Sequence, residues 1–146
     1  MHSLRLIAAA AIMLFASAGA FAQSKAVAVE DAWVRVHEGA VTAYFRIVNN
    51  AKEPERLISV STPVAGRAQL TSTRVRSGKF SFLPLAALEI DGFEEARLRP
   101  GETHVRLTDL TRELRVGDVV PLTLRFERSG NIEVTARVSN QLLGNR

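Results

Sequence analysis

One histidine stands beside a permanent cation in the stretch RPGETHVRL, residues 99–107. The stretch is typical of a β-strand, and Arg106 lies two positions after His104. Side chains two positions apart on a strand point to the same face of a sheet. An imidazole on such a face can bind a transition metal or transfer a proton, or it can be a polar group in contact with water. The residues that share this face with His104 therefore decide what it can do.

A second imidazole lies in a segment that we predict to be a turn. His37 belongs to RVHEGA, residues 35–40, next to Glu38 and Gly39. If this turn lay close to His104, two imidazoles and the Glu38 carboxylate could form a weak site for Cu(II) or zinc. Transition-metal sites take three or four protein ligands, and nothing in the sequence brings the two histidines together. We therefore expect His37 to be a solvated turn residue.

The sequence contains no recognisable catalytic constellation. It has no cysteine that could act as a nucleophile. The serines of SVST at 59–62 and TSTRVRS at 71–77 come without a histidine and a carboxylate at a spacing that indicates a triad. No glycine-rich phosphate loop is present. We therefore predict that the protein is not an enzyme.

The first 22 residues have the pattern of a secretory signal peptide. A basic start at Arg5 precedes an apolar run from Leu6, and small residues close on Ala20 and Ala22. An uncleaved membrane anchor is the other interpretation, but the run is marginal for a span of ~20 residues and ends in a cleavage pattern. We predict cleavage before Gln23, which leaves residues 23–146 as one domain in the periplasm of a Gram-negative cell.

The predicted mature chain offers no sulfur ligand. Met1 and Met13 are the only methionines, and there is no cysteine. Loss of residues 1–22 removes Arg5, so 18 basic and 15 acidic residues remain and the net charge is +3. The basic residues are spread along the chain, which argues against nucleic acid as a partner. No second apolar segment is long enough to span a bilayer, so we expect no stable membrane insertion after cleavage.

Alternation of apolar and polar residues dominates the rest of the sequence. Short strands separated by turn signals predict an all-β fold, an antiparallel β-sandwich or barrel with a single domain. Trp33 is expected to be a large buried anchor of the first strand. The predicted strands cover residues 25–36, 41–50, 56–62, 67–76, 79–83, 94–99, 103–110, 120–128 and 132–138.

Several collinear segments resemble the periplasmic copper chaperones of the PCu(A)C family. The resemblance implies a cupredoxin-like β-sandwich and a role in carrying copper toward the binuclear centre of cytochrome oxidase. It also implies a periplasmic copper protein or an oxidase-assembly factor as partner. The segments are DAWVR at 31–35, TAYFRIVNN at 42–50, SVSTPVAGRAQL at 59–70, LRPGETHVRL at 98–107 and LRVGDVVPLTLRFERSGNIEVTARV at 114–138.

The family binds copper through a histidine, ten residues, a methionine, twenty-one residues and then His-x-Met. Anchored at His104, this pattern falls on Thr71, Phe82, His104 and Arg106. Cu(I) is soft and prefers thioether and imidazole donors. Phe82 has no lone pair, Arg106 offers only hydrogen-bond donors and Thr71 offers a hard hydroxyl. His104 is therefore the one metal ligand that the resemblance leaves in place.

Two functions remain open at this stage. The first is the copper handling of the family in a divergent form, which includes docking onto a metallated partner that supplies the missing donors. The alternative is a metal-free relative that acts as a periplasmic protein- or anion-binding module. Intact spacing around His104 favours the first, whereas the replaced ligands favour the second.

Basic and aromatic residues at spacing two give further candidates for partner binding. The arginines form either a basic face for an acidic partner or anionic ligand, or the solvent-exposed side of strands whose neighbouring residues are apolar. Phe80 and Phe82 either fill the core or form an exposed apolar patch, and we expect the core. The candidate partner-binding arginines are Arg74, Arg76, Arg97, Arg99 and Arg106.

Overall fold

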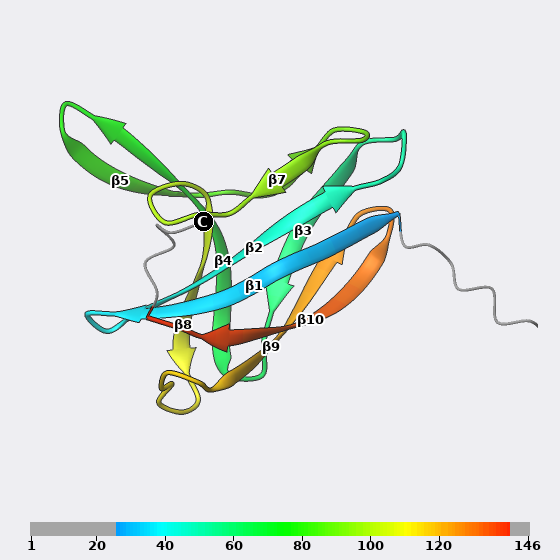
Figure 1. Ribbon diagram of the computed structural model, residues 1–146. Coiled ribbons are helices and arrows are strands. Elements are labelled where there is room, and N and C mark those ends of the chain that lie inside the picture. Colours follow the sequence, from blue (N-terminus) through cyan, green and yellow to red (C-terminus); the bar gives the residue numbers. More distant parts are fainter. Residues whose placement is uncertain (1–25, 141–146) are drawn as a thin grey trace, which may run out of the picture.

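The computed structural model describes residues 26–140, which form ten β-strands and no helix (Figure 1). The predicted signal peptide, residues 1–22, lies outside the described residues. Within residues 26–140 there is accordingly no helix long and apolar enough to cross a membrane. The all-β prediction is confirmed.

The strands agree closely with the alternation of the sequence, and one short strand was not predicted. β6 has three residues, of which Ile90 is buried, and such a segment is too short to show alternation. The strands are β1 (Val27–His37), β2 (Ala40–Asn49), β3 (Glu55–Ser61), β4 (Ala65–Arg76), β5 (Lys79–Pro84), β6 (Leu88–Ile90), β7 (Glu95–Arg97), β8 (His104–Leu110), β9 (Val119–Phe126) and β10 (Gly130–Val138).

All strands belong to one hydrogen-bonded sheet that folds over into a sandwich. Its order is β5-β4-β8-β2-β1-β10-β9-β3-β6, and β7 pairs with β2 beside this path. The pairs are antiparallel except for β1 with β10, which are parallel. One apolar core lies between the two halves and includes Phe45 of β2, Leu57 of β3, Val105 of β8 and Leu124 of β9.

The strands of the first half turn one face to the core and the other away from it. In β2, Ala43, Phe45 and Ile47 are buried in the core, as the alternation predicts. Thr42 and Tyr44 lie on the opposite face of β2. We call the face of β4, β8, β2 and β1 that is turned away from the core the outer face.

Trp33 does not lie in the core, contrary to the prediction. It is half-buried and stacks on Tyr44 with the ring centroids 4.6 Å apart. The reason is a β-bulge between Glu30 and Trp33, where the register of β1 on β2 shifts. One extra residue in a strand exchanges the two faces of everything that follows. The bulge thereby places Val34 in the core instead and gives the outer face an aromatic pair.

A buried carboxylate ties the start of β3 to the turn between β9 and β10. Glu55 is 3% exposed and accepts hydrogen bonds from the backbone N–H groups of Arg56, Arg128 and Ser129 at 2.9–3.0 Å, and from the Ser129 hydroxyl at 2.7 Å. Burial by itself raises the pKa of this carboxyl, but the hydrogen bonds outweigh burial and hold the pKa below its ordinary value of 4.5. The ionised form of Glu55 therefore stabilises the fold.

We expect Glu55→Gln to lower the free energy of unfolding by about 2 kcal/mol at neutral pH, because the amide NH₂ would face backbone donors that need an acceptor. Since the folded pKa is lowered, the stabilisation is complete above about pH 5 and is lost as the pH falls through the folded pKa. The stability gap between the wild type and the variant should therefore narrow in acid. Urea unfolding at a series of pH values measures this gap.

Glu127→Gln is the matched control for this experiment. The Glu127 side chain is 54% exposed and lies 3.7 Å from Arg56, so its loss should change stability by less than about 0.5 kcal/mol. Equal losses in the two variants, or a gap for Glu55→Gln that does not vary with pH, would contradict the role given to Glu55.

Candidate functional site

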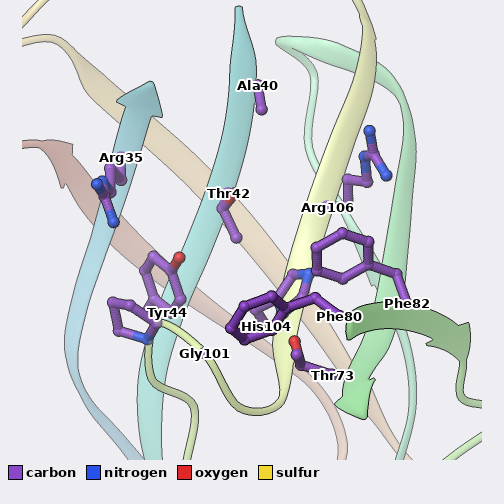
Figure 2. A pocket seen from close by; sticks show the side chains of 11 residues that line it. Arg35, Ala40, Thr42, Tyr44, Thr73, Phe80, Phe82, Gly101, His104 and Arg106 are labelled. Atoms are coloured by element: carbon purple, nitrogen blue, oxygen red, sulfur yellow. The ribbon is translucent and has the colours of Figure 1, made fainter. Parts of the chain in front are cut away.

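A pocket of about 270 Å³ opens on the outer face around His104 (Figure 2). Its floor is made by side chains of β1, β2 and β8, and its walls by the β4–β5 hairpin and by the loop between β7 and β8. Thr42 and Tyr44 of β2 point into it from the floor, and Phe80 and Phe82 stand at the wall formed by β5. The pocket lies on the face turned away from the core, so a ligand reaches it without unfolding the sandwich.

Strand register brings two arginines to this pocket from opposite sides of β2. Arg35 of β1 pairs with Thr42, and Thr42 pairs with Arg106 of β8. Figure 2 shows the two guanidinium groups flanking Thr42 and Tyr44. Arg106 was a sequence candidate, whereas Arg35, Thr42 and Tyr44 were not.

A signal for Arg35 was nevertheless present in the sequence. The β1–β2 turn consists of Glu38 and Gly39, both with positive φ (49° and 78°), as in the two-residue hairpin turn that favours Gly at its second position. A two-residue turn pairs His37 with Ala40 and fixes every later pair, including Arg35 with Thr42. Turn type therefore predicts this part of the pocket once the turn is recognised.

The loop of residues 98–103 forms the wall above His104. β7 and β8 pair one after the other with the same side of β2, and the loop leaves β2 between them. It starts where the Leu98 N–H donates to the Phe45 carbonyl at 2.9 Å and the Leu98 side chain is buried. The loop contains a turn at Pro100 and Gly101, and it joins two strands that share a neighbour rather than two strands of a hairpin.

This loop fixes the orientation of the His104 ring and the tautomer of its neutral form. The Glu102 carbonyl oxygen is 2.9 Å from His104 Nδ1 and accepts a second hydrogen bond from the Thr73 hydroxyl at 3.0 Å. A carbonyl can only accept, so Nδ1 carries the proton and the neutral ring has its lone pair on Nε2. The ring is 7% exposed and meets the Phe82 ring edge to face, with centroids 5.7 Å apart.

The four positions implied by the family pattern come close together. Thr71 pairs with His104 across β4 and β8, Phe82 packs on the His104 ring, and Arg106 follows His104 on the same face. As a donor set they do not fit a resident Cu(I) ion, because they offer one imidazole and one hydroxyl, and that Thr71 hydroxyl donates to the Gln69 carbonyl at 3.0 Å. Residues 26–140 contain no group of three or more His, Cys, Asp and Glu side chains placed to hold a metal.

His37 does not complete a site with His104. It ends β1 opposite Ala40. The β2–β8 register pairs Ala43 with Val105, so His104 lies beside Tyr44, four residues further along β2. Four residues along a strand span about 13 Å. The His37 side chain is 61% exposed, with Nε2 3.8 Å from the Glu38 carboxylate. His37 is solvated, as predicted, but it is the last residue of β1 rather than a residue of the Glu38–Gly39 turn.

The five candidate arginines do not form one basic face. Arg106 lines the pocket, whereas Arg97 donates to the Glu95 carboxylate at 2.8 Å. Arg74 and Arg76 are exposed on the β4–β5 hairpin, at positions that alternate with the pocket residue Thr73, and Arg99 is exposed in the loop above His104. Of the five arginines predicted from spacing two, Arg106 lines the pocket. Arg35, which was not among the five, lines it as well.

The expectation that Phe80 and Phe82 fill the core is wrong. They are 67% and 55% exposed, because β5 pairs with β4 alone and has no core beneath it. Both side chains line the pocket instead. Sequence alternation could not separate these cases, since it gives the faces of a strand but not what covers each face.

The Tyr44 hydroxyl in the pocket has a raised pKa. Burial raises the pKa of Tyr44, and the neighbouring Thr42 and Arg35 side chains offset part of that rise. The hydroxyl therefore stays protonated at neutral pH and presents a hydrogen-bond donor beside a guanidinium. Together these groups suit an anion better than a cation.

Comparisons with known proteins identify the fold and the family. A model of the LpqE-like lipoprotein family matches residues 27–138. No curated protein matches the sequence. Among solved structures, the copper-bound PCuAC domain from PmoF2 is 26% identical with a TM-score of 0.65, and the comparison covers 80% of this chain and 94% of that domain.

Two further structures agree with this result. The apo PCuAC domain from PmoF1 is 25% identical with a TM-score of 0.68, covering 80% of this chain and 95% of that one. Apo-DR1885 from Deinococcus radiodurans is 27% identical with a TM-score of 0.61, covering 99% of both chains. The chain therefore belongs to the LpqE-like family and is a PCu(A)C-type protein with a cupredoxin-like β-sandwich.

Proposed function

We propose that this protein is an exported, periplasmic binding module that uses the position of the family's copper site without holding Cu(I) on its own. The mature chain in this proposal is residues 23–146. The observation that carries it is the chemistry around His104, where the phenyl ring of Phe82 and the guanidinium of Arg106 stand in place of soft donors and a second guanidinium, that of Arg35, lines the same pocket.

Physical chemistry supports the loss of Cu(I) affinity in two ways. One imidazole and a hydroxyl that is already engaged cannot satisfy an ion that prefers several thioether and imidazole donors. Arg106 also carries a permanent positive charge on the face that a metal ion would occupy, and like charges repel strongly at short range. The same charges attract an anionic group.

The groups in the pocket also support a binding role over a catalytic one. His104 Nδ1 is oriented by a backbone carbonyl rather than by a carboxylate, and the Thr73 hydroxyl donates to the same carbonyl. A nucleophile needs a base within hydrogen-bond reach, and the base needs an orienting partner. Among the described residues, His104 is such an oriented base, but no hydroxyl of the pocket lining is hydrogen-bonded to its Nε2.

We expect no tight one-to-one Cu(I) binding when residues 23–146 are titrated against a calibrated chelator. The reason is the donor set, so His104→Ala should give the same background value as the wild type. Tight binding by the wild type that is lost in His104→Ala would overturn the proposal.

The converse change should create Cu(I) affinity. We expect the triple variant Thr71→His, Phe82→Met and Arg106→Met to gain one-to-one Cu(I) binding, because it supplies two imidazoles and two thioethers and removes a cation. Thr71 is 4% exposed, so the double variant at positions 82 and 106, both exposed, keeps a well-folded comparison. Circular dichroism checks the fold of each variant, and a folded triple variant without affinity would show that these positions do not form the site.

A second function is favoured by the free lone pair on His104 Nε2. A metal-binding histidine commonly donates its other ring N–H to a carbonyl or carboxylate, as His104 does to Glu102. In this alternative, the protein docks onto a periplasmic copper protein or an oxidase-assembly factor whose own donors hold copper. His104 then contributes one ligand during delivery toward cytochrome oxidase.

Complementation of a deletion strain separates the two functions. If His104 shares a copper ion with a partner, His104→Ala should reduce oxidase assembly markedly, whereas His37→Ala should not, because the exposed His37 lies away from the pocket. Oxidase activity of membranes is the measurement. Full complementation by His104→Ala would exclude the shared-ligand function and leave the metal-independent module.

A further inference from the structure

Within the described part of the chain, two arginines at the pocket have no carboxylate partner, whereas a third arginine on the same face has several. Arg46 lies near the other end of β2 and is surrounded by the carboxylates of Glu30, Asp31 and Glu95. Among residues 26–140, no Asp or Glu oxygen comes within ion-pair distance of Arg35 or Arg106. The outer face therefore has a charge-balanced end and an end with unbalanced positive charge.

Hydrogen-bond donors and apolar surface accompany this charge. The hydroxyls of Thr42 and Tyr44 lie between the two arginines (Figure 2). Phe80 and Phe82 continue the pocket onto the β4–β5 hairpin, which projects from the body of the sandwich (Figure 1). Val75 pairs with Phe80 and is 55% exposed, so it extends the same apolar surface.

The size of the pocket limits what can enter it. Pockets that bury most of a drug-sized ligand measure about 300–1,000 Å³. This pocket, at about 270 Å³ and open to solvent, lies below that range, so it suits a single acidic side chain or a small anion better than a drug-sized ligand. An acidic side chain in the pocket would leave the exposed surface of Phe80 and Phe82 uncovered. That surface suits apolar residues on either side of the acidic residue in a longer segment.

We propose that the pocket and the β4–β5 hairpin form one docking surface for an acidic, apolar segment of a partner protein. A carboxylate of the segment lies between Arg35 and Arg106 and accepts from the Thr42 and Tyr44 hydroxyls. Apolar side chains on either side of it pack on Phe80 and Phe82. This inference rests on the proposed function, because it fills the same pocket with a ligand other than Cu(I).

A second copy of this chain is the nearest competing occupant. The loop that contains Phe93, which is 73% exposed, also carries Asp91 and Glu94 and so has the stated chemistry. It lies between β6 and β7, away from the pocket, so its insertion into another copy would be a head-to-tail contact. Such contacts continue into open chains unless the rotation closes a ring. A separate partner protein is therefore the occupant that we infer.

The test is selection of phage-displayed twelve-residue random peptides on immobilised wild-type chain, residues 23–146. The expected result is enrichment of peptides with Asp or Glu flanked by apolar or aromatic residues. Their affinity, measured by fluorescence anisotropy, should fall about tenfold or more in Arg35→Gln and in Arg106→Gln, because each removes a charge-assisted hydrogen bond. Phe82→Ser should weaken the same peptides.

Arg74→Gln is the matched control, since Arg74 is an exposed hairpin arginine at a position that alternates with the pocket residue Thr73. It should leave the affinity within about twofold, as expected for a charge outside the contact. All of the substituted arginines are on the surface, and circular dichroism verifies that each variant is folded. An equal loss in Arg74→Gln and Arg106→Gln would overturn the proposal, because it would show non-specific attraction of acidic peptides.

Three other outcomes would also overturn it. One is enrichment without acidic residues. Another is that no peptide is enriched, while free 3-phenylpropionate binds saturably to the wild type and not to Arg106→Gln. That result would indicate a small-molecule site. The third is concentration-dependent self-association in light scattering that is abolished by Phe93→Ser and by Arg106→Gln.

Failure of this inference is distinguishable from failure of the proposed function. The Cu(I) titration decides whether the site holds the metal on its own, and it does not depend on any peptide. Absence of peptide binding together with absence of Cu(I) binding would overturn the docking surface and leave the metal-free module intact.

Discussion

Burial of alternate side chains in β8 is the constraint from which the site follows. Val105 and Leu107 are 0% and 3% exposed, so both belong to the core. A strand cannot bury them without turning His104 and Arg106 to the outer face. A shift of the β8 register by one residue would bury a guanidinium and an imidazole in the core, which would strongly destabilise the fold. Whatever binds at His104 must therefore also meet Arg106.

The arrangement explains how one position in a fold can change its ligand class while the fold persists. Phe82 and Arg106 are exposed on the outer face, so replacement at these two positions costs the sandwich little stability. The backbone around His104 is held by strand pairing with Thr71 and by the Glu102 carbonyl, neither of which depends on a metal. In the proposed function, arginine and phenylalanine stand at the two methionine positions of the family pattern, and the pocket then prefers an anion to a cation.

Sequence alternation was sufficient for the strands other than β6 and for the shared face of His104 and Arg106. It was not sufficient for Trp33, because the core-facing valines change from odd to even positions between Val29 and Val34, and the pattern does not say on which side of this shift Trp33 lies. It also failed for Phe80 and Phe82, whose exposure depends on β5 being an edge strand. The placement of Arg35 and Arg106 on the two sides of Thr42 depends on the pairing of three strands. The only sequence signal for this pairing is the Glu38–Gly39 turn, which sets the register of β1 on β2.

The stability of the β4–β5 hairpin and the affinity of the pocket depend on the same contacts. β8 pairs with β4 up to Thr71, and beyond that residue β4 pairs with β5 alone. A two-stranded hairpin without a core beneath it is marginally stable by itself. Its contacts with the rest of the site include the hydrogen bond from Thr73 to Glu102 and the packing of Phe82 on His104. A ligand that adds contacts to Phe80 and Phe82 therefore also stabilises the hairpin. The free energy of ordering it is drawn from the binding energy, so affinity at this site depends on how firmly the 98–103 loop and His104 already hold the hairpin in place.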